Sequence, residues 1–234
     1  MRIGVVHPGE MGAAVAASLR SAGHTVLWAS EGRSAATRAR AAGLEDAGSV
    51  AELARTCDVV LSICPPHAAV DVARAFASFG GIYADMNAVS PATARTIAGI
   101  VPRFVDGGII GLPGSARLYV SGAHADEIAT ALGATVVPNA SALKMAYAAW
   151  TKGTGALILA VRDLAAAEGV TDALHAEWRL SQPQLFDRLA AAERSAAAKG
   201  WRWVAEMEEI ADTFAADGLP DGFHRAAAEI FRER

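Results

Sequence analysis

The sequence has few of the residues that mark several classes of protein. It contains 2 cysteines, Cys57 and Cys64, among 234 residues. They are too few and too close for a disulfide framework, so we expect a reducing, cytoplasmic setting. The sequence has no apolar run of the roughly 18 residues that cross a membrane, and its first strand signal starts at Arg2, which leaves no room for a signal peptide. The net charge of −4 gives no reason to expect a nucleic-acid partner.

Lysine is also scarce. Of the 21 basic residues, only Lys144, Lys152 and Lys199 are lysines. A desolvated lysine can lose its proton and an arginine effectively cannot, so these lysines are candidates for proton transfer. No group of His, Cys, Asp and Glu has metal-ligand spacing, and we expect no metal.

The N-terminal segment carries the clearest signal of function. An apolar run over 2–6 breaks at a Gly-containing turn over 7–12, continues as an Ala-rich helix over 13–22 and returns as an apolar strand at 25–28. A βαβ unit of this length, with glycines where the strand meets the helix, is how a chain binds the diphosphate of a dinucleotide.

Within this turn each glycine has an expected role. Gly9 lets the backbone approach the diphosphate, and Gly12 lets the helix pack closely on the strand. Glu10 and Met11 lie between them in the first helical turn, whose free N–H groups point at the phosphates. His7 stands where the first glycine of G-x-G-x-x-G is usual, so an ordinary strand-to-helix turn is the alternative interpretation.

Helix and strand signals then alternate along the chain. This alternation predicts a Rossmann-type, doubly wound α/β domain over residues 1–139. The expected helices cover 34–42, 50–56, 67–79 and 90–100, and the expected strands cover 58–63, 82–86, 104–106, 117–121 (an edge strand) and 135–137.

The remainder, residues 140–234, reads as a small all-helical domain. Four of the five tryptophans lie in it. So apolar a segment predicts a homodimer formed through these C-terminal helices, because large exposed apolar patches are rare on monomers. The expected helices cover 141–168, 172–180, 183–198, 201–216 and 222–232.

Six segments, in this order, carry a resemblance to a known family: residues 4–12, 21–26, 58–65, 85–91, 106–111 and 141–145. Together they resemble the β-hydroxyacid dehydrogenase superfamily, which includes 3-hydroxyisobutyrate dehydrogenase, 6-phosphogluconate dehydrogenase and the imine reductases. Within it, residues 108–111 and 203–210 look most like a little-studied bacterial branch with a short helical C-terminal domain. The resemblance covers nearly the whole chain.

The resemblance implies a hydride transfer in which the protein manages one proton. Lys144 takes the place of the catalytic lysine, and burial in an interdomain cleft is expected to lower its pKa. Asn87 takes the place of a residue that reaches the nicotinamide ribose or the substrate. Cys64 and Pro65 take the place of a strand end beneath the nicotinamide.

Two departures from the family pattern bear on the substrate. A Ser-Gly-Gly that holds a carboxylate in the family is replaced by Ile110, Gly111 and Leu112, and an isoleucine side chain makes no hydrogen bond. The asparagine expected four residues after the lysine is Ala148. Lys152 or Thr151, further along the same helix, could compensate.

Other polar residues in these segments have plainer expected roles. We expect Asp106 to fix the substrate loop and His67 to start a helix. Cys64 has an equal alternative as a small buried residue. Glu206 and Glu209 are expected on a solvated helix face, and entry into the cleft of a partner subunit is the alternative.

The choice of cofactor depends on the end of the second strand. Ser30, Arg33 and Ser34 could bind a 2′-phosphate, with the arginine forming a bidentate pair. Glu31 argues for NAD if it points inward, since NAD-specific folds hold the ribose hydroxyls with an acidic residue there. We expect NADP, with NAD possible.

The sequence therefore predicts a cytoplasmic NADP-dependent oxidoreductase acting on a small oxo or hydroxy acid, with Lys144 as proton donor and acceptor. An imine reductase-like enzyme is one alternative. The other is a non-catalytic dinucleotide-binding protein, which the unusual residues His7, Ile110 and Ala148 motivate.

Overall fold

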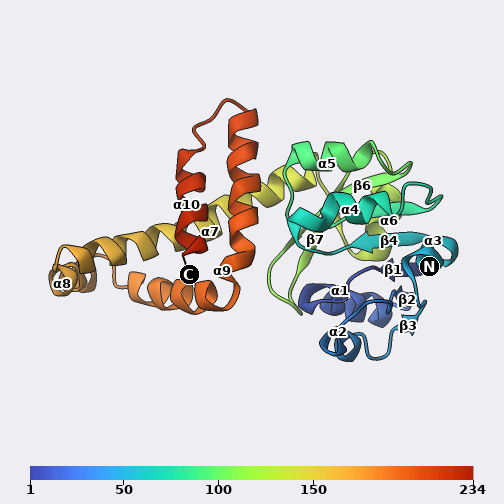
Figure 1. Cartoon of the computed structure of the whole chain (residues 1–234), viewed down its shortest axis with the longest axis horizontal. Helices are drawn as coiled ribbons and strands as arrows, with labels where there is room; N and C mark the ends of the chain where they lie inside the picture. Colours follow the sequence, from blue (N-terminus) through green and yellow to red (C-terminus); the bar gives the residue numbers. More distant parts are fainter. Residues whose placement is uncertain (234) are drawn as a thin grey trace. The chain divides into compact units, whose positions relative to one another are not determined.

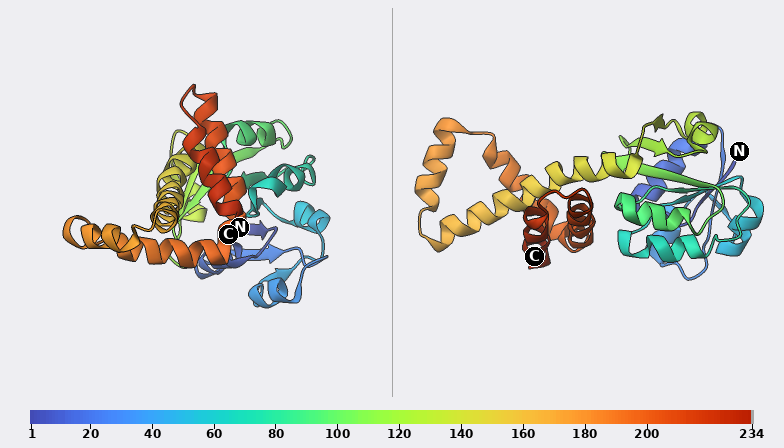
Figure 2. Two further views of the ribbon diagram at one scale, coloured as in Figure 1. Left: turned by 60° about the vertical axis from the view of Figure 1, so that its left-hand side comes forward. Right: turned by 90° about the horizontal axis from the view of Figure 1, so that it is seen from above.

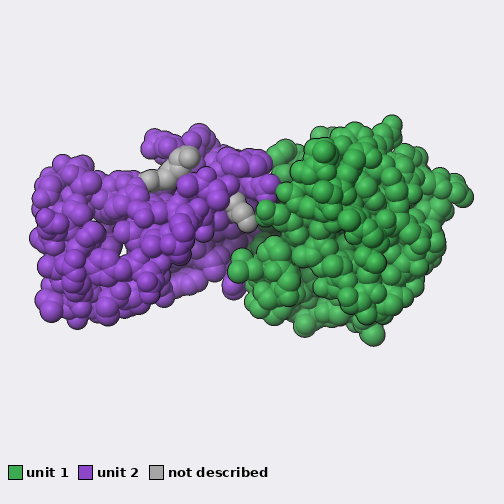
Figure 3. Space-filling view, turned by 90° about the horizontal axis from the view of Figure 1, so that it is seen from below, with its two compact units in different colours: residues 1–144 green, residues 145–234 purple. Residues whose placement is uncertain are grey.

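The computed structural model describes residues 1–233, the side chain of Lys199 apart, and divides into two compact units. The first is residues 1–144 and the second 145–234 (Figure 3). Helix α7 (Ala140–Ala167) begins at the domain boundary expected from the sequence and contains the division between the units in its second turn.

The first unit is built on one eight-stranded sheet with the order β3-β2-β1-β4-β5-β6-β7-β8. Strands β1 to β6 are parallel, β7 is antiparallel to β6, and β8 is parallel to β7. The order 3-2-1-4-5-6 of the first six strands is that of dinucleotide-binding folds. The strands are β1 (Arg2–Val5), β2 (Thr25–Trp28), β3 (Glu45–Asp46), β4 (Val59–Ser62), β5 (Ile82–Asp85), β6 (Phe104–Ile110), β7 (Arg117–Ser121) and β8 (Thr135–Val136).

Helices cover both faces of this sheet (Figure 1). Because side chains alternate along a strand, Val59 and Leu61 lie in the core layer of α1 and α6, and Val60 lies in the layer of α3, α4 and α5. The doubly wound α/β fold is confirmed. The helices of this unit are α1 (Glu10–Ser21), α2 (Ala35–Arg40), α3 (Val50–Thr56), η1 (Pro66–Ala68), α4 (Ala69–Arg74), α5 (Pro91–Ala98) and α6 (Ala125–Leu132).

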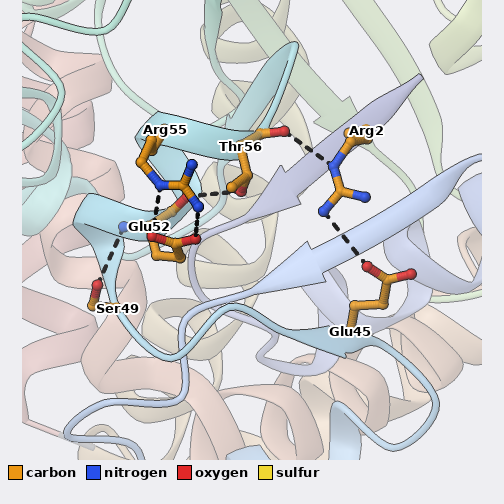
Figure 4. Close-up of polar contacts among 6 residues, drawn as sticks. All are labelled: Arg2, Glu45, Ser49, Glu52, Arg55 and Thr56. Atoms are coloured by element: carbon orange, nitrogen blue, oxygen red, sulfur yellow. Dashed lines mark hydrogen bonds and ion pairs between the residues drawn. The ribbon is translucent and has the colours of Figure 1, made fainter.

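Polar contacts tie the start of the chain to neighbouring elements (Figure 4). The Arg2 Nε donates to the Thr56 carbonyl at 3.1 Å, and its guanidinium pairs with Glu45 of β3 at 3.6 Å. The Ser49 hydroxyl accepts the Glu52 N–H at 3.2 Å and caps α3. The two Arg2 contacts link the start of β1 to β3 and to the end of α3.

Two expectations for this unit are wrong. Strand β7 is not an edge strand, since β8 pairs with its far side. Strand β6 continues to Ile110 through the residues expected to form the substrate loop. The reason is the antiparallel pairing with β7, in which Gly107 faces Val120. The glycines suggested a loop, but a Cβ at Gly107 would lie 2.8 Å from the Asp85 carbonyl oxygen, so packing explains this one.

The second unit contains the rest of α7 together with α8 (Thr171–Ser181), α9 (Leu185–Ala216) and α10 (Gly222–Arg232). The expected break in α9 at Gly200 is absent, and one helix replaces the two predicted. A glycine in a helix costs about 1 kcal/mol relative to alanine, and the Ala-rich flanks continue the helix through it. Helix α10 packs antiparallel on α9, with the rings of Trp203 and Phe231 centred 5.0 Å apart.

The remaining helices of this unit leave an open apolar space. Figure 2 shows α7, α8 and the first part of α9 following a triangular path. A cavity of about 560 Å³ lies among them, lined by Trp150, Ile158, Trp178 and Trp203 among others. Within residues 1–233, no helix has the length and apolar character required to cross a bilayer.

Candidate cofactor and catalytic site

The sequence-predicted site residues of the first unit gather at one edge of the sheet. Strands β1, β2, β4 and β5 are parallel, so the turns that follow them meet at their carboxyl edge. Gly9 follows β1, Arg33 follows β2, Cys64 follows β4 and Asn87 follows β5. Open α/β sheets bind their ligands at this edge.

The glycine turn has the shape expected for a diphosphate site. Gly9 is the N-cap of α1 and supplies no side-chain cap, and a Cβ there would have no atom within 4 Å. A Cβ on Gly12 would lie 2.5 Å from the His7 carbonyl oxygen, so only glycine allows α1 to approach the turn. Met11 packs on the core and the Glu10 side chain is exposed. The space above Gly9 and the uncapped helix start fit a phosphate group.

Of the three phosphate ligands predicted in the turn after β2, two form hydrogen bonds with neighbouring protein groups instead. The Ser34 hydroxyl is the N-cap of α2 and accepts the Thr37 N–H at 3.2 Å. Ser30 is buried, and its hydroxyl hydrogen-bonds the Asp46 carboxylate. Arg33 is half-buried, and its Nε has no hydrogen-bond partner among the described residues. Arg33 is therefore the side chain of this set that is free for a ligand.

Asn87 is buried and saturated by neighbours. Its Oδ1 accepts the Cys64 N–H at 2.6 Å, and its Nδ2 donates to Ser62 at 3.1 Å and Asp85 at 2.8 Å. Both amide hydrogens are thus used. The side chain ties the end of β5 to the end of β4, so it positions the backbone of Cys64. Contact with a ribose or substrate stays a prediction.

The residues after β4 have plain structural roles. Burial raises the pKa of the Cys64 thiol to about 11, so the thiolate that a nucleophile requires is absent near neutral pH. Pro65 is exposed and precedes η1, and His67 lies exposed within η1.

Asp106 fixes the start of α7. Its Oδ2 accepts the Ser141 N–H and the Ser121 hydroxyl, both at 2.9 Å, and Ser121 in turn accepts the Ala140 N–H at 2.9 Å. A carboxylate at a helix N-terminus satisfies free N–H groups and the positive end of the helix dipole. Asp106 therefore anchors α7 to β6 and β7.

Lys144 lies one turn along α7, against β6. Its Nζ donates to the Ile109 carbonyl at 2.8 Å, and burial lowers the pKa of its ammonium group. A Cβ on Gly108 would lie 3.2 Å from the Lys144 Cβ, so Gly108 makes room for the lysine. Asp85 pairs with Asp106 in the sheet, and Ile109 is three residues further along β6. Lys144 is therefore beyond the carboxyl end of β5, at the edge where the cofactor turns lie.

Lys152 and Glu206 of the second unit are half-buried. Lys152 Nζ forms an ion pair with Glu206, whose side chain is only 15% exposed. The expectation of a solvated Glu206 is wrong, because α7 and α9 bring the two opposite charges together. Ala148 is buried and Thr151 lines the cavity of this unit. Over residues 1–233, no three His, Cys, Asp or Glu side chains gather as metal ligands would.

Sequence reasoning missed the supporting network around Asn87. Asp85 accepts the Asn87 backbone N–H as well as its side-chain amide, and Ser62 contributes from β4. A buried aspartate directly after apolar residues at a strand end was the available signal, since a buried carboxylate requires partners.

Two parts of the chain match known protein families. Residues 2–112 match the NAD binding domain of 6-phosphogluconate dehydrogenase, and residues 165–234 match a Domain of unknown function (DUF1932). An uncharacterised 28.5 kDa protein from the 7S RNA 5′ region of Methanothermus fervidus is 31% identical in an alignment of 188 residues, and the match covers 74% of each chain. The chain belongs to the β-hydroxyacid dehydrogenase superfamily. This confirms the family expected from the sequence.

Solved structures of the superfamily share the fold. The conserved protein MTH1747, of unknown function and described as similar to 3-hydroxyacid dehydrogenases, is 28% identical at a TM-score of 0.71, over 100% of this chain and 96% of its own. The 3-hydroxyisobutyrate dehydrogenase of Salmonella typhimurium is 18% identical with a TM-score of 0.71, and the match covers 100% of this chain and 93% of the dehydrogenase. The imine reductase of Streptomyces aurantiacus is 20% identical with a TM-score of 0.53, and the match covers 100% of this chain and 94% of the reductase.

Proposed function

We propose that this protein is an NADP-dependent oxidoreductase that transfers a hydride between nicotinamide and a small oxo or hydroxy acid, with Lys144 as the proton donor and acceptor. The observation that carries the proposal is the placement of Lys144, a half-buried lysine at the carboxyl edge of a dinucleotide-binding sheet. Bound nicotinamide supplies or accepts the hydride.

The environment of Lys144 suits proton transfer. An ammonium group has three N–H bonds, and the Ile109 carbonyl takes one of them, which leaves two for a ligand. Burial lowers the pKa of this group toward the range where proton transfer is efficient. In reduction Lys144 gives its proton to the developing alkoxide oxygen, and in oxidation neutral Lys144 takes the hydroxyl proton.

The choice of NADP is supported at the end of β2. Arg33 is half-buried there without an internal partner, and an arginine at this place accommodates a 2′-phosphate in NADP-binding folds. Glu31, the acidic alternative, is exposed and its backbone N–H donates to the Gly48 carbonyl at 2.8 Å.

One observation favours a second candidate, an imine reductase-like activity. The end of β6 presents Ile110 and Gly111 where the family holds a carboxylate, and Ile110 is buried. A site without a donor there discriminates poorly for an acid. A non-catalytic dinucleotide-binding protein is the third reading.

Two measurements test these proposals. Thermal unfolding with NAD, NADP and their reduced forms measures binding, since a ligand that binds the folded state raises its Tm. NADPH labelled with deuterium at C4 is then incubated with a panel of oxo acids and cyclic imines. Label in an oxo-acid product supports the proposal, and label only in an imine product supports the second candidate. A Tm shift with no transfer to either class leaves the non-catalytic reading.

We also propose that the protein forms a homodimer through its C-terminal helices. Large apolar side chains of the second unit are exposed, among them Trp150 at 66%, Leu164 at 63% and Leu180 at 83%. The apolar cavity among α7, α8 and α9 adds to this surface. Exposed apolar side chains that are this numerous on one unit are usually covered by a partner.

A further inference from the structure

Two basic side chains lie together at the carboxyl edge of β1 and β2. These strands are parallel neighbours, and Val5 at the end of β1 pairs with Trp28 at the end of β2. His7 is two residues past the end of β1, and Arg33 is in the turn that follows β2. Both side chains are half-buried.

Neither side chain has a polar partner in the part of the chain that the structure describes. His7 Nδ1 and Arg33 Nε are each buried without a hydrogen bond. Burial of a polar group without a hydrogen bond is costly, so unpartnered groups of this kind call for an explanation. An anion held between them would supply the missing acceptors.

The other polar groups of this region do have internal partners. Ser34 caps α2, and the Arg38 guanidinium donates to the Ser30 carbonyl at 2.8 Å. The Asp46 carboxylate accepts the Gly48 N–H at 2.7 Å and the Ser30 hydroxyl. His7 and Arg33 therefore stand out from an otherwise satisfied turn.

The charge around His7 is positive. Burial, and after it the charge of Arg33 in the turn after β2, lowers the pKa of His7 to about 4. Burial also lowers the pKa of Arg33. The acidic side chains nearest in the two segments, Glu10 of α1 and Glu31 of the β2 turn, are exposed. The free protein thus holds His7 neutral and leaves Arg33 without a counter-ion.

We infer that His7 and Arg33 together bind the 2′-phosphate of the cofactor, and that His7 takes up one proton from solvent as this phosphate binds. The inference rests on the proposed function and names how the site selects its cofactor. A phosphate dianion beside His7 offsets the field of Arg33 and favours imidazolium, which donates from both ring nitrogens. The first glycine of the motif is thus replaced by a phosphate ligand.

Calorimetric titration of the full chain with NADP and NAD tests this inference. Each titration is run at pH 7.5 in two buffers of different ionisation enthalpy, neither of them phosphate. A phosphate monoester has its second pKa near 6 and is already a dianion at this pH, so proton uptake reports the protein. We expect net proton uptake with NADP and none with NAD. NADP affinity should fall about 10-fold per pH unit between the His7 pKa of the free protein, about 4, and the higher His7 pKa of the complex, and should be constant above the latter.

Variants separate the contributions of the two residues. His7→Gly restores the usual glycine, so we expect it to keep NAD binding, abolish proton uptake and weaken NADP binding about 10-fold, the usual range for a charged hydrogen bond. Arg33→Ala is expected to weaken NADP binding by about 10-fold to 100-fold and to leave NAD binding unchanged. His124→Gln, a change in a histidine paired with Glu127 far along the chain, is the matched control and leaves every value unchanged. If His7→Gly does not fold, His7→Asn takes its place.

Three outcomes have distinct meanings. NADP binding without proton uptake, or a His7 variant that binds NADP as the wild type does, overturns the inference and leaves the proposed function standing. Tighter binding of NAD than of NADP overturns both the inference and the choice of NADP. No binding of either dinucleotide overturns the proposed function itself, and the inference with it.

Discussion

At the scale of single residues, the site depends on side chains whose surroundings change their chemistry. Lys144 is the clearest case, because its half-buried amine donates to a backbone carbonyl and burial lowers its pKa. Burial favours the neutral amine. An arginine at the same position would keep its proton at any pH at which the protein is folded.

Replacing Lys144 tests its assignment. We expect Lys144→Met and Lys144→Arg to lower kcat by about 10²-fold to 10⁴-fold, the usual contribution of a positioned acid or base. Dinucleotide binding should stay within about 3-fold of the wild type, because Gly9 and Arg33 are untouched. Steady-state kinetics and a binding titration measure the two effects. Normal turnover in Lys144→Met would remove the lysine from the mechanism.

His7 makes a separate prediction about stability. Its pKa is about 4 in the folded protein and 6.5 in the unfolded chain, so between these values the unfolded state binds more protons. Stability is therefore fully present above pH 6.5 and is lost as the pH falls toward 4. We expect a loss of about 1–2 kcal/mol over this window, allowing for the partial exposure of the ring.

Urea unfolding at pH 7.5, 6.5, 5.5 and 4.5 measures this dependence, and His7→Asn is the comparison. We expect the variant to lose less stability than the wild type as the pH falls. Parallel pH profiles for the two proteins would show that His7 is not the group responsible.

At the scale of elements, the junction of β6 and α7 positions the lysine. Asp106 holds the first turn of α7 through Ser141 and Ser121, and Gly108 gives α7 the room to lie against the strand. We therefore expect the position of the Lys144 amine to depend on the Asp106 carboxylate.

Removing this anchor should affect stability and catalysis together. Asp106→Ala leaves two buried donors without an acceptor, and we expect a loss of about 2–4 kcal/mol in the free energy of unfolding and a lower kcat. Asp106→Asn keeps one acceptor oxygen and should lose less of both. Denaturant unfolding and kinetics at saturating substrate measure the two quantities. An Asp106→Ala protein as active as the wild type would separate the anchor from the lysine.

The elements also show what a sequence can and cannot predict. The βαβ alternation, the helix start at Ser90 and Pro91 and the apolar β4 depend on local patterns, and the structure has them where they were expected. Gly107 and Gly200 led to wrong predictions of a strand end and a helix break. A glycine pattern does not show whether the residue is required for a turn or for close packing. The difference lies in contacts with residues distant in the sequence.

The same limit applies to the candidate site. The choice of Lys144 followed from a family landmark, but its contact with the Ile109 carbonyl of β6 could not be predicted from spacing. The pairing of Lys152 with Glu206 joins two helices more than fifty residues apart. From the sequence alone, His7 is only a departure from the glycine motif, because no local pattern shows that Arg33 lies near it.

At the scale of the whole molecule, exposed apolar surface is concentrated in the second unit. Trp150, Leu157 and Leu164 lie on α7, and Leu180 lies on α8. The first unit buries its apolar side chains on both faces of the sheet. The surface available for self-association therefore belongs to the helices.

Sedimentation velocity tests the proposed dimer. We expect the wild type to sediment as a dimer at micromolar concentration and the double variant Trp150→Lys, Leu164→Lys to sediment as a monomer, because two charges per subunit would be buried. Leu112→Lys is the matched control, since Leu112 is 72% exposed in the first unit. A monomeric wild type, or a double variant that remains dimeric, would contradict the assignment.

The edge strands of the sheet are too short to pair with a strand of another molecule. Both β3 and β8 consist of two residues, and β3 is the acidic pair Glu45 and Asp46. A long, flat outer strand is the usual template on which a foreign segment adds and fibrils grow, and a two-residue strand offers almost no ladder to extend. We therefore expect the folded protein not to form cross-β aggregates in concentrated solution.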